Sequence, residues 1–94
     1  MHAVFVVSRI DASRIEEAEA ALRNGIGPMV ENAPGFVSAT FGRSADGTQG
    51  RSCAVFESEA QAKSMIDAAL AGMPADGPIQ VLEHYIFPVT LRLG

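Results

Sequence analysis

The sequence contains few of the residue types on which several protein classes depend. Its 94 residues include one cysteine, two histidines and no tryptophan, with seven basic against eleven acidic residues. The single Cys53 allows no intrachain disulfide and no thiolate metal cluster, which fits a reducing cytoplasm. The basic residues are scattered, so the sequence predicts no positive surface that would neutralise the phosphates of a nucleic acid.

Long apolar runs and nucleotide fingerprints are also missing. No apolar stretch approaches the roughly 20 residues that span a bilayer, and the start at Met1–Phe5 lacks the basic and long apolar regions of a signal peptide. We therefore expect a cytoplasmic protein with one domain over residues 1–94 that binds neither membrane nor nucleic acid. The glycines form no Gly-x-Gly-x-x-Gly or P-loop pattern, so no cofactor is predicted.

Hydrophobic periodicity predicts strands and helices in the order β-α-β-β-α-β. The expected strands are His2–Ile10, Phe36–Arg43, Arg51–Glu57 and Ile79–Phe87. A polar segment centred on Asp46-Gly47 separates the second strand from the third, as in a hairpin.

Two segments between these strands carry apolar residues at helical spacing. Capping-box spacing at Ser13–Glu16 and again at Ser58–Gln61 marks the expected start of each helix. Gly25–Pro28 predicts a kink or break in the first helix, and Gly72 is expected to end the second.

This order of elements predicts an α+β fold of the ferredoxin-like kind, with a four-stranded antiparallel sheet, the fourth strand beside the first, and both helices on one face. Two helices cover one face only, and the other face would alternate to polar residues if it met water. The first strand is instead apolar on both faces from Val4 to Val7. We therefore expect a homodimer, in which a second copy covers about 800 Å² of this face.

Three segments carry a resemblance to a known family: Val4–Arg9 leading to Ser13–Glu17, Ala33–Phe36 before the second strand, and Ala54–Ala60 at the end of the third. They resemble the dimeric α+β barrel superfamily and, within it, the antibiotic-biosynthesis-monooxygenase (ABM)-like domains. The resemblance implies a dimeric barrel and a small-molecule monooxygenase that works without a cofactor.

The resemblance is incomplete at the positions that carry chemistry. Family members that oxidise polycyclic aromatics or degrade haem hold a tryptophan where Phe56 stands. The haem degraders also use an asparagine of the first strand and a histidine of the second helix. This chain offers Val6 or Val7 at the first position and no histidine at the second, which argues against haem degradation.

His84 and Tyr85 are the candidate catalytic residues, because an imidazole or a phenol can move a proton. Strand alternation places these neighbours on opposite faces, so only one of them can line a given pocket. By analogy with the family tryptophan, Phe56 is expected to stack on the ligand. The other interpretation of His84 is an imidazole satisfied by backbone or solvent at the dimer seam.

The expected substrate pocket combines apolar side chains with a few hydroxyls. Val4, Val6 and Ser8 would line it from the first strand. A hairpin centred near Gly47 would add Ser38, opposite Phe56, and Thr40, opposite Ala54. Such a pocket suits a small, flat, mostly apolar or aromatic ligand.

His2 and Cys53 carry weaker alternatives. His2 could approach His84 if the first and fourth strands pair, but two histidines without further ligands do not predict a metal site. The neighbours of Cys53 supply no positive charge, so we expect a small core residue rather than a nucleophile.

Two functions remain open from the sequence. The first is an enzyme resembling cofactor-independent monooxygenases. The second is a non-catalytic dimeric barrel that binds a ligand or has a structural role. A titratable side chain facing into the pocket would favour the enzyme.

Overall fold

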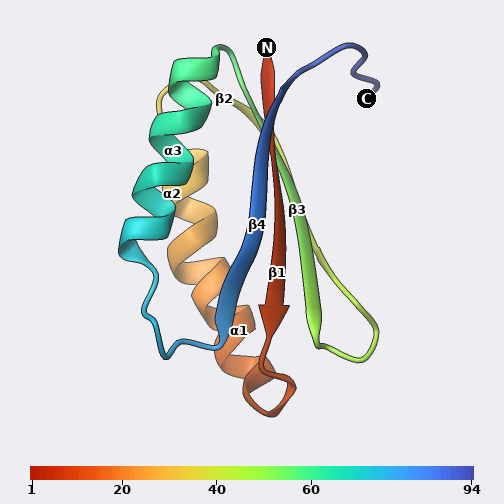
Figure 1. Ribbon diagram of the computed structural model, residues 1–94, viewed down its shortest axis with the longest axis vertical. Coiled ribbons are helices and arrows are strands. Elements are labelled where there is room, and N and C mark those ends of the chain that lie inside the picture. The colour runs from red at the N-terminus through yellow and green to blue at the C-terminus, as the bar shows by residue number, and fades with distance from the viewer.

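A computed structural model describes residues 1–94 and shows a curved sheet with helices on one side (Figure 1). The strands are β1 (His2–Ile10), β2 (Phe36–Arg43), β3 (Gln49–Phe56) and β4 (Ile79–Pro88). The helices are α1 (Ile15–Ala21), α2 (Gly27–Glu31) and α3 (Glu59–Gly72). None of them is both long and apolar enough to cross a bilayer.

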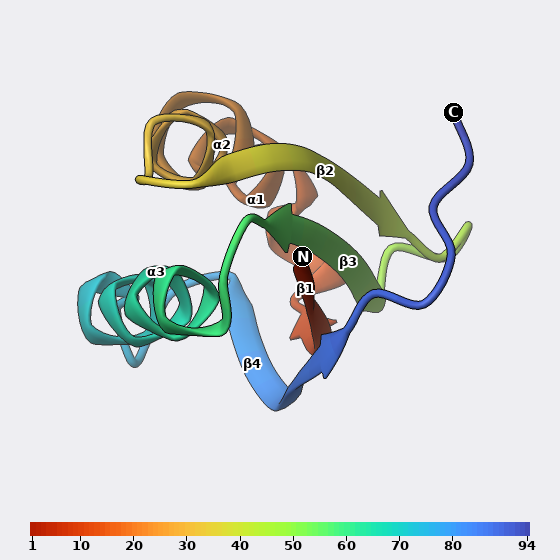
Figure 2. The same ribbon diagram turned by 90° about the horizontal axis from the view of Figure 1, so that it is seen from above.

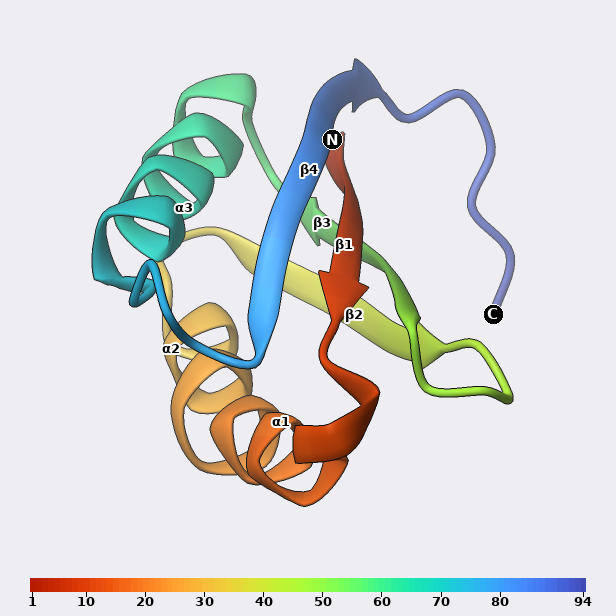
Figure 3. The ribbon, with the colours of Figure 1, turned by 60° about the horizontal axis from the view of Figure 1, so that its bottom comes forward.

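The sheet has the strand order β2-β3-β1-β4, and every neighbouring pair is antiparallel. Figure 3 shows β4 and β2 as the two edges, with β1 and β3 between them. The predicted ferredoxin-like α+β fold is therefore confirmed, including the pairing of the fourth strand with the first.

The core lies between the sheet and the helices, which all pack on one face (Figure 2). Val4 of β1 and Phe56 of β3 are completely buried there, together with Met65 and Ile66 of α3. The ring of Phe36 meets that of Phe56 edge-on, with centroids 6.1 Å apart. These apolar contacts hold α3 against the middle of the sheet.

The two helix starts agree with the sequence to different degrees. Ser58 caps α3 as predicted, since its hydroxyl accepts a hydrogen bond from the Gln61 N–H at 3.2 Å. The predicted cap at Ser13 is wrong. Asp11 caps a short 3₁₀ turn (Ala12–Arg14) instead, and its carboxylate accepts from the Ser13 N–H at 3.0 Å. An aspartate two residues earlier serves the free N–H groups equally well.

The predicted interruption of the first helix takes the form of a π-helical turn (Leu22–Ile26) between α1 and α2. The Gly27 N–H donates to the Leu22 carbonyl, five residues back. Pro28 follows and has no N–H to donate. A Cβ at Gly27 would lie 2.8 Å from the Leu22 oxygen, so the wide turn depends on this glycine.

The β2–β3 hairpin turns at Gly47, whose φ is +76°, close to the predicted centre. Its register differs from the prediction. Ser38 lies opposite Val55 and Thr40 opposite Cys53, because pairing shifts by one residue between Phe36 and Ser38. A shift of one residue moves every following side chain to the other face. The predicted pairing of Ser38 with Phe56 and of Thr40 with Ala54 is therefore wrong.

The sheet face away from the helices carries exposed aromatic rings. Phe5, Tyr85 and Phe87 are 40%, 44% and 51% exposed. Phe87 lies 5.8 Å from Phe5 and stacks at 5.9 Å on Tyr85, measured between ring centroids. The chain after β4 also runs on this side (Figure 2). We call Phe5, Tyr85 and Phe87 the aromatic patch.

Candidate functional site

A cavity of about 160 Å³ lies between the sheet and the helices. Seventeen of its 24 lining residues are hydrophobic. They come from all four strands of the sheet on one side and from α1 to α2 and α3 on the other. The cavity is thus an apolar, partly open chamber between the two layers of the fold, a common position for small-molecule sites.

In the sheet wall of the cavity, three residues lie side by side on neighbouring strands, and the middle one is a glycine. Ser8 of β1 pairs with Gly50 of β3, which in turn pairs with Arg43 of β2. A Cβ at Gly50 would lie 2.5 Å from the hydroxyl oxygen of Ser8. The absence of a side chain at Gly50 therefore makes room for the Ser8 hydroxyl.

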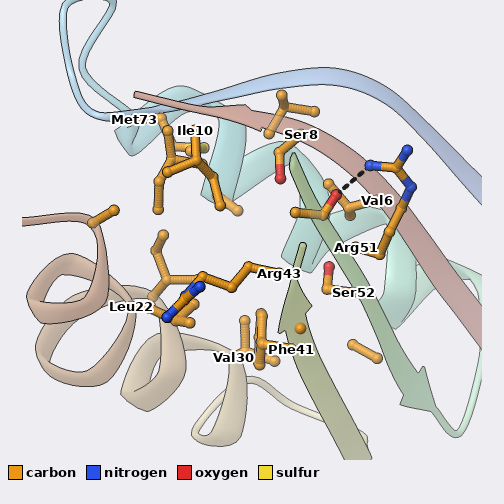
Figure 4. Close-up of a pocket in the computed structure, with 18 of the residues that line it drawn as sticks. Val6, Ser8, Ile10, Leu22, Val30, Phe41, Arg43, Arg51, Ser52 and Met73 are labelled. Atoms are coloured by element: carbon orange, nitrogen blue, oxygen red, sulfur yellow. Dashed lines mark hydrogen bonds between the residues drawn. The ribbon is translucent and has the colours of Figure 1, made fainter. Parts of the chain in front are cut away.

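Two hydroxyls interrupt the apolar lining. Ser8 and Ser52 are half-buried side chains on the cavity wall, and neither hydroxyl hydrogen-bonds to another protein group. Figure 4 shows the Ser8 oxygen directed toward the space above Arg43. These hydroxyls are free to bind polar atoms of a ligand.

One ion pair crosses the cavity wall from the sheet to the helices. The Arg43 Nε donates to the Glu19 carboxylate at 2.9 Å, and both residues line the cavity. The other carboxylate oxygen of Glu19 lies 3.8 Å from Arg23 on the outer surface. Glu19 and Arg43 are thus titratable or charged groups at the edge of an apolar chamber.

The sequence-predicted lining residues of the first strand lie where they were expected. Val4, Val6 and Ser8 all line the cavity from β1. Phe56 has the same orientation but is completely buried in the core against Phe36, and it does not line this cavity. The substrate-binding role of all four residues remains a prediction.

Ser38 and Thr40 are not brought to the cavity. The shifted hairpin register places them on the open face of the sheet, in rows with Val55 and Cys53. Ala39 and Phe41 take the positions facing the helices, and Phe41 lines the cavity.

The two predicted catalytic residues also lie outside the cavity. His84 pairs with Val6 and so shares its face, but it is exposed at the edge strand and is not a lining residue. Tyr85 pairs with Phe5 on the open face. Its hydroxyl donates to the Glu83 carboxylate at 2.5 Å, and this hydrogen bond raises the pKa of the phenol.

The remaining sequence candidates lie apart from one another. His2 pairs with Pro88, and three residues of β4 lie between Pro88 and His84. The nearest acidic partner of His2 is Glu59 at 3.6 Å. Partial burial raises the pKa of the Cys53 thiol, which keeps it protonated near neutral pH. No three His, Cys, Asp or Glu side chains gather in a way that could hold a metal ion.

Sequence reasoning missed Glu19, Arg43 and Gly50. Two signals were available. Glu19 stands in the apolar stripe formed by Ile15, Ala18 and Leu22, where a carboxylate is unexpected. Arg43 continues an alternation of inward positions, but only with the correct hairpin register.

No model of a known protein family matches the sequence, and no curated protein matches it significantly. Solved structures match over the whole fold. HapK from Hahella chejuensis superimposes with a TM-score of 0.77 at 12% identity, covering 100% of this chain and 98% of HapK. The haem degrader MhuD from Mycobacterium tuberculosis, with two haems bound in its active site, gives 0.73 at 22% identity and covers all of both chains.

A monooxygenase from Streptomyces coelicolor, ActVA-Orf6 in complex with nanaomycin D, gives a TM-score of 0.64 at 24% identity. The match covers 99% of this chain and 91% of the monooxygenase. The chain therefore shares the ferredoxin-like fold of antibiotic biosynthesis monooxygenases and of MhuD, as the sequence motifs predicted.

The residues of the cavity do not fit a haem. Haem iron is held by a histidine, a thiolate or a tyrosine, with methionine usually opposite a histidine. The lining contains none of the first three, and α3 carries no histidine. The chain thus shares a fold with MhuD without the side chains that would ligate the iron.

Proposed function

We propose that this protein is a small-molecule monooxygenase that oxidises a small, flat, mostly aromatic substrate in the cavity between sheet and helices, without a cofactor. The observation that carries the proposal is the apolar cavity of about 160 Å³ with free hydroxyls and a cation on its wall. The fold shared with the monooxygenase ActVA-Orf6 supports the same reaction class.

In this reaction the protein has to bind the substrate and promote its deprotonation. An enolisable aromatic ketone loses a proton to give its enolate, which transfers one electron to O2. The resulting radical and superoxide combine at carbon to a peroxide anion. The anion takes the proton back to become a hydroperoxide, which loses water to leave the carbonyl. The net change converts a CH2 group and O2 into a C=O group and H2O. The protein must bind the substrate, stabilise its anion and exclude bulk water.

We place the proton acceptor elsewhere than at His84 or Tyr85, because neither residue lines the cavity within one chain. His84 is exposed at the sheet edge and Tyr85 is on the open face. We propose that the substrate proton leaves through the side of the cavity bounded by Glu19 and Arg43, which are the partly exposed end of the lining.

We further propose that the working form is a homodimer built on the open sheet face. The aromatic patch would otherwise expose three large rings to water, and contiguous exposed apolar patches on small proteins usually mark an interface. In such a dimer Tyr85 would belong to the interface rather than to the cavity.

The reaction is tested by incubating the purified protein with naphthols and with anthrone under ¹⁸O-labelled oxygen, in the presence of a chelator. We expect oxygen uptake, one labelled atom in the product and one in water. Val6→Phe, which fills the cavity from β1, should abolish turnover, and circular dichroism checks that this variant folds. Binding of these compounds without oxygen uptake would instead establish the non-catalytic ligand-binding barrel.

A further inference from the structure

The row Ser8–Gly50–Arg43 places two hydrogen-bonding side chains on either side of a glycine. Adjacent strands lie about 4.8 Å apart, so β1 and β2 are separated by about twice that distance with β3 between them. Gly50 has no side chain of its own, and the Ser8 hydroxyl oxygen lies 2.5 Å from the place that a Cβ there would take. The Ser8 hydroxyl therefore leans over β3 toward β2, the strand that carries Arg43.

Arg43 has donors to spare for such an atom. A guanidinium carries five N–H groups. The Nε donates to Glu19 at 2.9 Å and the Nη1 to the Ser44 carbonyl at 3.2 Å. The remaining three N–H groups make no hydrogen bond within the protein. The side chain is 41% exposed, so it is neither locked in the core nor free in solvent.

Glu19 already accepts a hydrogen bond from the Arg43 Nε, so an anionic ligand has to use the other N–H groups of the guanidinium. Its carboxylate is the only acidic group on the cavity wall, and a second cation, Arg23, lies 3.8 Å from its other oxygen. The single negative charge of Glu19 therefore faces two cations, and Arg43 can also attract an anionic ligand.

We propose, building on the function proposed above, that Ser8, Gly50 and Arg43 form an oxyanion subsite that selects aromatic ligands carrying an acidic oxygen. The ring system lies in the apolar chamber, and the oxygen lies between the Ser8 hydroxyl, which leans over Gly50, and the Arg43 guanidinium. Charge-assisted hydrogen bonds from arginine favour the anionic form of such an oxygen. The chain has a net charge of −4, so selection for an anion rests on this local site and not on the overall field.

Binding of a matched pair of probes tests the subsite without using any activity. The probes are 2-naphthoate, which is anionic at pH 7, and 2-naphthamide, which is its neutral counterpart. Titration calorimetry gives both affinities for the wild type and for Arg43→Gln. We expect Arg43→Gln to weaken naphthoate binding at least about tenfold, the typical loss for a hydrogen bond to a charged group, and to change naphthamide binding less than about threefold.

Two further variants sharpen the result. Glu19→Gln should strengthen naphthoate binding, because the competing negative charge is gone. Lys63→Gln removes an equal charge from the outer surface of α3, where Lys63 is 67% exposed and does not line the cavity, and should leave both affinities nearly unchanged. Equal losses for both probes in Arg43→Gln, or no loss for either, would overturn the subsite. Failure of the wild type to bind either probe would overturn the ligand cavity as well, and with it the proposed function.

Discussion

Gly50 and Ser8 lie opposite each other on β3 and β1, and a Cβ atom at Gly50 would stand 2.5 Å from the serine hydroxyl oxygen. The absence of a side chain at Gly50 thus allows the Ser8 hydroxyl to point toward β3. Gly50→Ala should turn the Ser8 hydroxyl away and fill the space beside Arg43. We expect naphthoate binding to weaken by about two- to tenfold, the loss of one neutral hydrogen bond or slightly more, as measured by calorimetry.

Gly42 provides the matched control for this substitution. It lies on the neighbouring strand, and a Cβ there would meet only the Arg51 carbonyl oxygen, at 3.9 Å. Gly42→Ala should therefore leave naphthoate affinity unchanged. Equal affinities for the two alanine variants would show that the space above Gly50 is not part of the binding site.

The fold was predictable from this sequence because its signals are local and repeated. Four apolar strands near the predicted bounds, a capped helix at Ser58 and a turn at Gly47 all agree with the structure. The hairpin register was not predictable, because the irregularity between Phe36 and Ser38 has no composition signal and inverts Ser38 and Thr40. Because the register was predicted wrongly, Arg43 was not recognised as a residue that faces the helices, which follows from its pairing with Gly50.

The π-helical turn offers a second pair of glycine substitutions with opposite expected signs. Gly27→Ala places a Cβ 2.8 Å from the Leu22 carbonyl oxygen and should destabilise the protein by about 1–3 kcal/mol. Gly25→Ala meets nothing within 4 Å and should stabilise by about 0.5–1 kcal/mol, through the lower entropy of the unfolded chain. Urea unfolding measures both. A stabilising Gly27→Ala would mean that the wide turn relaxes to an ordinary α-helix.

If the aromatic patch is the dimer interface, a charged side chain introduced there should prevent dimerisation. Phe87 contacts both other rings of the patch, so Phe87→Glu would place a carboxylate in the middle of the proposed dimer interface. Burying an unpaired charge there is costly, and we expect a dimeric wild type and a monomeric variant by analytical ultracentrifugation. Ala71→Glu, on the exposed side of α3, should remain dimeric. A monomeric wild type would contradict the proposed interface.

Asp46 makes the hairpin turn sensitive to acid. Hydrogen bonds from Ser44 and Thr48 lower the pKa of its carboxyl from 3.8 to about 2. A lowered pKa in the folded state stabilises the protein above pH 3.8, and this stabilisation is lost as the pH falls toward 2. The difference in unfolding free energy between wild type and Asp46→Asn should therefore be constant near neutral pH and decline between about pH 4 and 2. A difference that does not change with pH would remove Asp46 from the acid response.

His84 has a side chain of a type that often acts in catalysis, but its position in the fold argues against that role. An imidazole can act as a general base, but the side chain of His84 is exposed on the edge strand and does not line the cavity. We expect His84→Ala to keep turnover within about twofold of wild type, since a general base contributes about 10²–10⁴-fold when it acts. Initial rates of oxygen uptake measure this, with Ser8→Ala as the comparison that should reduce turnover. A loss of a hundredfold or more in His84→Ala, with an unchanged circular dichroism spectrum, would place the imidazole in the reaction. It would also require that the dimer brings this edge to the cavity of a neighbouring subunit, because within one chain β4 directs His84 to solvent.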